Sequence, residues 1–134
     1  MGKLVQCSEA LTDLQRYREV GTLDYLRDHQ DIYYAVCYRF IGGIEALFDA
    51  GQIILASHGQ HAAGDGDIPV LLGRRKIISD ELASAFTNMY GFRNRLVHAY
   101  GTLDDSKVAE YLQRHLVDIE ELISVFRDTV TSSE

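Results

Sequence analysis

The sequence predicts an all-α fold, an antiparallel helical bundle with about four main helices and one or two short ones. Apolar residues recur at spacings of three and four along most of the chain, as on one face of an amphipathic helix. Nowhere does polarity alternate with the period of two that is typical of a strand. With 134 residues and 46% apolar content, the chain is expected to form a single domain, residues 1–134, around one core.

The first helices are predicted over residues 3–19 and 22–29, separated by Gly21. Spacings of three and four place one apolar stripe on the longer of the two. This stripe consists of Leu4, Cys7, Leu11 and Leu14. A third helix is expected to begin near Asp31, a plausible N-cap, and to continue to about residue 56.

This third helix is the candidate hub of the bundle. Its apolar residues cover most of the helix circumference, and its polar residues occupy one narrow arc formed by Tyr34, Tyr38, Glu45, Asp49 and Gln52. A helix of this kind is surrounded by neighbours, which belong either to the bundle itself or to a second subunit. Gly42 and Gly43 in its middle allow a close helix crossing or a kink.

Residues 57–67, SHGQHAAGDGD, break the helical pattern and predict a flexible loop. The loop contains side chains that can bind metals, namely His58, His61, Asp65 and Asp67. A metal site also needs rigid supporting contacts, which this loop does not offer, so no metal site is expected. A short helix is predicted around residues 69–72.

Two longer helices complete the chain. Ser79 is expected to cap a helix that continues to about His98, because acidic residues follow it in the first turn. A final helix is predicted to follow Asp104 or Asp105, with apolar residues at helical spacing up to Phe126. Residues 131–134 are expected to form a frayed tail.

The charge of the chain is unevenly distributed. The formal net charge is −7, which gives no sign of nucleic-acid binding, but residues 74–98 hold five basic against two acidic side chains. A local positive site on an acidic protein can still attract a polyanion at short range. Chance clustering on a solvated face is an equally good interpretation.

The cysteines and the apolar segments indicate a cytoplasmic protein without membrane contact. Cys7 and Cys37 lie on separate predicted helices without metal-type spacing, and two thiols do not make the disulfide framework of a secreted domain. We therefore expect both to be reduced core residues. The N-terminus lacks the pattern of a signal peptide, and no stretch approaches the 18 apolar residues of a transmembrane helix.

The segment RNRLVHAY, residues 93–100, carries the most informative polar residues. On a wheel of the helix that ends near His98, Arg93 lies within the apolar stripe. An arginine there is costly unless its charged head is paired or reaches a wet cleft. The opposite arc is small or polar and consists of Ser84, Thr87, Gly91, Asn94 and His98. Structurally, Arg93 could simply reach past the stripe to water and His98 could cap the helix end.

This segment resembles the Arg-x4-His signature of the HEPN superfamily, and of its HepT-like branch of small toxins in particular. The likeness extends to GFRNRLVHAY at residues 91–100, to HLVDIEEL at 115–122 and to DAGQIIL at 49–55. It covers most of the chain. The glycine-rich loop 57–67 and the second arginine, Arg95, depart from the pattern but do not fall on the signature positions.

The resemblance implies a metal-independent endoribonuclease that acts as a homodimer and needs no cofactor. His98 would exchange protons with the 2′-hydroxyl of RNA and the leaving 5′-oxygen, since its unperturbed pKa suits both roles. Arg93 would hold the scissile phosphate, and Asn94 would position the imidazole or the phosphate. Gly91, Thr87 and Arg95 are candidates for the dimer contact and the cleft.

The resemblance also implies a partner protein. Such toxins pair with a minimal nucleotidyltransferase antitoxin that adds AMP to the tyrosine two residues after the histidine, here Tyr100. The added charge and bulk would exclude RNA. Two other readings stay open: a non-catalytic HEPN-type module that binds a nucleotide or a partner protein, and a helical dimer in which Arg93 and His98 only support the interface.

Overall fold

The computed structural model describes residues 2–98 and 104–133 and contains only helices, turns and loops in them. The seven α-helices are α1 (Gly2–Arg18), α2 (Leu23–Asp28), α3 (Gln30–Ser57), α4 (Ile68–Arg74), α5 (Asp80–His98), α6 (Asp105–Arg114) and α7 (Leu116–Ser133). A 3-10 turn, η1 (Asp65–Asp67), precedes α4. The all-α prediction is therefore confirmed.

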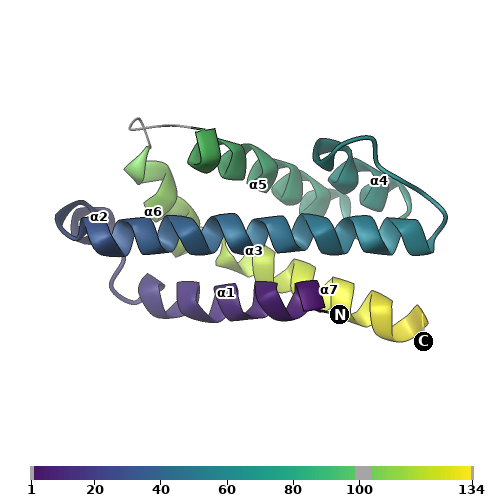
Figure 1. Cartoon of the computed structure of the whole chain (residues 1–134), viewed down its shortest axis with the longest axis horizontal. Coiled ribbons are helices and arrows are strands. Elements are labelled where there is room, and N and C mark those ends of the chain that lie inside the picture. The colour runs from purple at the N-terminus through teal and green to yellow at the C-terminus, as the bar shows by residue number, and fades with distance from the viewer. Residues whose placement is uncertain (1, 99–103, 134) are drawn as a thin grey trace.

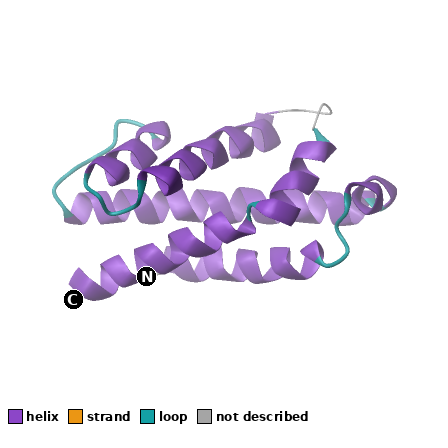
Figure 2. Ribbon diagram, turned by 180° about the vertical axis from the view of Figure 1, so that it is seen from behind, coloured by secondary structure: helices purple, strands orange, loops and turns teal. Residues whose placement is uncertain are grey.

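Helix α3 runs the full length of the molecule and contacts every other long helix (Figure 1). Helices α1 and α7 lie along one side of it, and α4 and α5 lie along the other (Figures 1 and 2). Thirteen of its residues are buried, among them Phe40 and Phe48. The apolar circumference that the sequence shows is thus filled from both sides, as expected of a hub.

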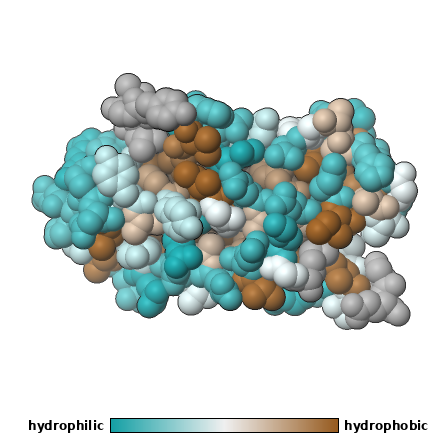
Figure 3. Space-filling model, in the orientation of Figure 1, coloured by the Kyte–Doolittle hydropathy of each residue, from teal (hydrophilic) through white to brown (hydrophobic). Residues whose placement is uncertain are grey.

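By length and composition α3 could also cross a membrane, since an 18-residue window reaches a mean hydropathy of 1.3. This differs from the expectation that no segment would qualify. In the fold, 56% of that window is buried inside the protein, and the face in Figure 3 shows separate apolar patches among hydrophilic residues. A core helix has the same composition, and this is the place that α3 occupies.

The start of α3 differs from the prediction. The helix begins at Gln30, with His29 in the N-cap position and no side-chain cap hydrogen bond. Only His29 separates α2 from α3, and its ring stacks on Tyr25 of α2 at 3.9 Å between ring centres. Asp31 therefore falls in the first turn, where its charge suits the helix dipole, and does not act as the cap.

The predicted final helix is two helices in the structure, because the helix is interrupted at His115, between α6 and α7. Helix α6 packs on α2 and α1, whereas α7 packs on α1, α3 and α5. A straight helix could not reach both sets of neighbours. Leu112 and Leu116 are nevertheless both buried, so the apolar period that suggested one helix continues through the break.

Two predicted caps position the helix that carries the motif and the helix that follows it. The Leu82 amide of α5 donates to the Ser79 hydroxyl at 3.1 Å, and the Lys107 amide of α6 donates to the Asp104 carboxylate at 3.3 Å. Both satisfy amides that a helix start leaves without partners. Gly43 allows the close crossing of α3 on α1, since a Cβ there would lie 3.1 Å from that of Ala10.

Candidate functional site

Helix α5 places the candidate residues through its amphipathic pattern. Its buried face consists of Leu82, Phe86, Met89 and Phe92. Phe92 fixes the end of that face, because its ring packs edge-on against Phe40 of α3 and stacks on Tyr111 of α6 at 3.9 Å. Arg93 follows directly, at the margin where α5 meets α3.

The Arg93 side chain is only 15% exposed, and its guanidinium lies between two carboxylates. Its Nη1 is 3.6 Å from Glu45 Oε1 on α3, and its Nη2 is 3.5 Å from Asp65 Oδ2 on η1. Both carboxylates are about half exposed. The Arg93 charge, which the helical wheel places in the apolar stripe, is thus paired at the surface of the core, as its burial requires.

The rest of the guanidinium contacts an aromatic ring and the protein interior. Arg93 Cζ lies 5.5 Å from the centre of the Tyr90 ring, within the range of a cation–π contact. Arg93 Nε is buried, and no described residue accepts its hydrogen. A buried donor without a partner costs about 1–3 kcal/mol, so this arginine is retained at some expense to stability.

Asn94 is partly buried and His98 is exposed at the last position of α5. Among the described residues, no side chain forms a hydrogen bond or ion pair with either of them, so the structure does not join Asn94 to the imidazole. His98 follows Arg93 by five residues, which at about 100° per residue is one full turn plus roughly 140° around the helix. Within one chain, the two motif residues therefore point to different sides of α5.

The three cleft candidates, Thr87, Gly91 and Arg95, line one groove of about 430 Å³ between α5 and α6. The stacked rings of Phe92 and Tyr111 contribute to its lining, α6 adds Lys107 and Glu110, and His115 follows directly after α6. A Cβ at Gly91 would meet nothing within 4 Å. The groove is thus open to a second chain or a ligand. Lys107 and His115 contact Glu110 at 3.3 and 3.6 Å, and the ion pair and hydrogen bond with Lys107 lower the pKa of Glu110.

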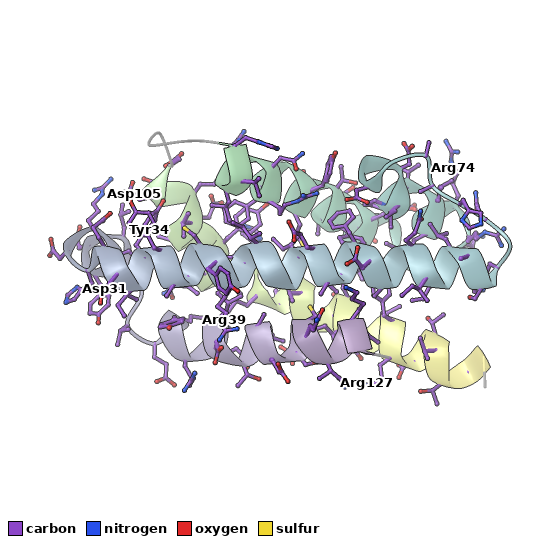
Figure 4. All side chains as sticks on the ribbon, viewed as in Figure 1. Asp31, Tyr34, Arg39, Arg74, Asp105 and Arg127 are labelled. Atoms are coloured by element: carbon purple, nitrogen blue, oxygen red, sulfur yellow. The ribbon has the colours of Figure 1, made fainter. Side chains whose placement is uncertain are left out.

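The basic segment of residues 74–98 does not form one positive patch. Arg74 ends α4, and Arg75 and Lys76 lie in the turn before α5, whereas Arg95 lies 19 residues after Lys76, near the end of α5. At 1.5 Å per residue the helix separates them by more than 20 Å. Figure 4 shows Arg74 at one end of the molecule and Asp105, which follows the motif, at the other. Residues 74–76 therefore lie apart from the basic residues of the motif.

Sequence reasoning missed the roles of Glu45 and Asp65 beside Arg93. The wheel position of Arg93 indicated a need for a charged partner but not which residue supplies it. Among the described residues, no group of three or more metal-binding side chains occurs. Tyr100 lies outside the described residues.

Comparison with known structures shows several of the same fold. The chain matches a toxin–antitoxin complex with AMP-PNP at 22% identity, with a TM-score of 0.84 over 93% of this chain and 95% of that one. It matches a tri-AMPylated Shewanella oneidensis HEPN toxin in complex with MNT antitoxin at 23% identity, with a TM-score of 0.86 over 95% of both chains. A mutant of an MntA toxin–antitoxin complex matches at 22% identity with a TM-score of 0.85, over 95% of this chain and 96% of that one.

No curated protein sequence matches the chain. The family comparison is positive, however. The model of the family described as "Ribonuclease HepT-like" matches residues 7–126, which include all seven α-helices in whole or in part and the whole motif from Arg93 to Tyr100. The chain therefore belongs to the HepT-like ribonuclease family.

Proposed function

We propose that this protein is the toxin of a toxin–antitoxin pair and a metal-independent endoribonuclease of the cytoplasm. The observation that carries the proposal is the position of Arg93, a mostly buried cation kept at the margin of the core despite an unpaired Nε atom. An exposed histidine stands five residues later on the same helix. Costly placement of a charge is typical of functional sites more than of structural ones.

The residues suit cleavage of RNA by its own 2′-hydroxyl. A neutral His98 takes the proton from this hydroxyl, and the 2′-oxygen then attacks the adjacent phosphorus. The bond from phosphorus to the 5′-oxygen breaks, and a protonated histidine supplies the proton that the leaving oxygen needs. The products are a 2′,3′-cyclic phosphate and a 5′-hydroxyl, and no metal ion is required at any step.

Arg93 and Asn94 act on the phosphate. The guanidinium stabilises the negative charge that builds on the phosphoryl oxygens during the attack. Each terminal nitrogen of Arg93 carries two hydrogens, so contact with one carboxylate on each leaves hydrogens for the phosphate. Asn94 lies about 100° around the helix from Arg93 and one turn before His98, where its amide can orient the imidazole or a phosphate oxygen.

The active form is a homodimer. One motif supplies one histidine, while the reaction uses one base and one acid, and Arg93 and His98 of one chain point to different sides of α5. A second copy, packed against the ridge of Thr87 and Gly91, would bring a second motif to the same cleft. Gly91 suits such a contact because it is exposed and nothing in its own chain lies near it.

A nucleotidyltransferase antitoxin is the proposed partner, and Tyr100 is the proposed site at which it adds AMP. Support comes from similarly folded toxins in complex with antitoxins, one of them described as tri-AMPylated. Phosphodiester groups beside His98 would repel RNA and fill the cleft. In a reaction with ATP and such an antitoxin, the wild type should gain mass in steps of AMP, and Tyr100→Phe should not. AMP addition to Tyr100→Phe at the wild-type rate would assign the modification to another residue.

The test of the nuclease is an RNA cleavage assay in EDTA that compares the wild type with His98→Ala and identifies the end groups. Cleavage by the wild type alone, leaving cyclic phosphates, is the expected result. If unmodified wild type cleaves no cellular RNA, the protein is instead a non-catalytic module that binds a nucleotide or partner protein. If His98→Ala changes thermal stability alone, the histidine serves only the interface.

A further inference from the structure

We propose that the glycine-rich loop is a positioning element of the site, in which Asp65, together with Glu45, holds the Arg93 guanidinium in the orientation that meets the phosphate. This inference rests on the proposed nuclease function and assigns two residues that the motif itself does not contain. It also gives a role to residues 57–67, the segment in which the chain departs from the pattern of its family.

The contacts converge on Arg93 from three elements. Glu45 approaches Nη1 from α3 at 3.6 Å, and Asp65 approaches Nη2 from η1 at 3.5 Å. The Tyr90 ring supports the guanidinium from α5 itself. Since Nε is buried, the guanidinium is fixed on its inner side by the protein interior and at both terminal nitrogens by carboxylates.

The glycine-rich loop packs against the Tyr90 ring. A Cβ at Gly66 would lie only 3.2 Å from Tyr90 Cε1, closer than most side-chain contacts. Tyr90 in turn packs against Phe48 of the hub helix, with 5.6 Å between ring centres. Phe48, Tyr90 and Gly66 therefore form a continuous series of contacts, and this series determines where Asp65 lies relative to Arg93.

The ion pairs of Arg93 with Glu45 and Asp65 orient the guanidinium more than they stabilise the fold. Both carboxylates are about half exposed, and exposed pairs are typically worth no more than about 1 kcal/mol. An arginine side chain has many rotamers, however, and a displacement of about 1 Å at a reacting group can cost about a hundredfold in rate. Loss of Asp65 should therefore affect turnover more than folding.

The first test needs no nuclease activity. In ¹⁵N NMR of the arginine side chains, the buried Nε–H of Arg93 should exchange slowly with water, and its resonance is assigned by its loss in Arg93→Lys. We expect Asp65→Ala to accelerate this exchange by about tenfold or more, and Glu45→Ala to act in the same direction. Asp67→Ala is the matched control, because it removes the same charge from the same 3-10 turn and Asp67 makes no ion pair with Arg93. Unchanged exchange in Asp65→Ala would overturn the proposal.

The second test uses cleavage of RNA under the same conditions. Asp65→Ala should lower kcat by about tenfold with little change in KM, as expected for a displaced phosphate-binding group, and Asp67→Ala should match the wild type. Gly66→Ala should lower kcat in the same way, because the added methyl group pushes the loop away from Tyr90. This variant keeps Asp65, so it tests the position of the loop even if the loop misfolds in Asp65→Ala. Faster cleavage by Asp65→Ala would mean that the carboxylate opposes the phosphate, which contradicts a positioning role. If the wild type itself does not cleave RNA, the nuclease proposal fails, and the exchange measurement alone decides the role of the loop.

Discussion

The guanidinium carbon of Arg93 lies 5.5 Å from the centre of the Tyr90 ring, one turn earlier on the same helix. This contact compensates part of the cost of holding a cation at the margin of the core. It does not satisfy the buried Nε hydrogen, for which no described residue provides an acceptor. Stability and the proposed function therefore make opposite demands on this position.

Replacing Arg93 with methionine should stabilise the fold. Methionine fills similar space along the apolar stripe and removes the unpaired Nε donor, which costs about 1–3 kcal/mol. The two carboxylates that it leaves behind are about half exposed to water. We expect the melting temperature to rise by about 2–4 °C per kcal/mol gained, as measured by calorimetry. RNA cleavage should be lost in the same variant. A clear fall in melting temperature would show that the pairs with Glu45 and Asp65 stabilise the fold after all.

Much of the fold follows from short-range patterns in the sequence. The helical period places α1, α3 and α5 within one or two residues of their predicted bounds. Ser79 and Asp104 cap helices as predicted, because a cap depends on residues only a few positions apart. The helical wheel likewise predicted that the charge of Arg93 would need pairing. The wheel places Arg93 in the stripe of Leu82 and Phe86, and that position depends on one helix alone.

The features that the sequence did not predict depend on contacts distant in the chain. Asp65 lies 28 residues before Arg93, and no local pattern brings the two together. The break at His115 arises because α6 and α7 pack on different neighbours. Arg74 and Arg95 belong to one basic stretch of sequence, but the length of α5 separates them, which composition alone does not show.

The adjacent glycines of α3 should differ in how much an added side chain destabilises the fold. A Cβ at Gly43 would lie 3.1 Å from the Ala10 Cβ, whereas one at Gly42 would meet nothing within 4 Å. Gly43→Val should therefore force α1 and α3 apart and lower the free energy of unfolding by about 1–3 kcal/mol. Gly42→Val, the matched control, should change it by no more than about 0.5 kcal/mol. Equal effects in urea unfolding would contradict the close crossing at Gly43.

The two thiols should be unreactive in the folded protein. Burial raises the pKa of Cys7 to about 12 and that of Cys37 to about 11, and only the thiolate reacts with alkylating agents. Iodoacetamide at pH 8 should label neither residue until urea unfolds the chain, as followed by mass spectrometry. Rapid labelling of Cys7 in the native protein would show that α1 detaches readily from the core.

The same pKa shifts set a direction for stability at high pH. In the unfolded chain a cysteine thiol has its ordinary pKa of 9.0, while folding keeps it protonated to a higher pH. The unfolded state therefore binds fewer protons above about pH 9, and stability should fall as pH rises from there towards 12. Cys7→Ala should lose less stability over this range than the wild type.

The most direct test of the central claim is single-turnover cleavage of RNA by Arg93→Ala, compared with Arg74→Ala. Both variants remove one positive charge, but Arg74 is exposed at the far end of the molecule (Figure 4). If Arg93 stabilises the phosphate in the transition state, its loss should slow cleavage about a hundredfold or more, while Arg74→Ala keeps the wild-type rate. Equal rates in the two variants would contradict the account, because Arg93 would then contribute only general charge.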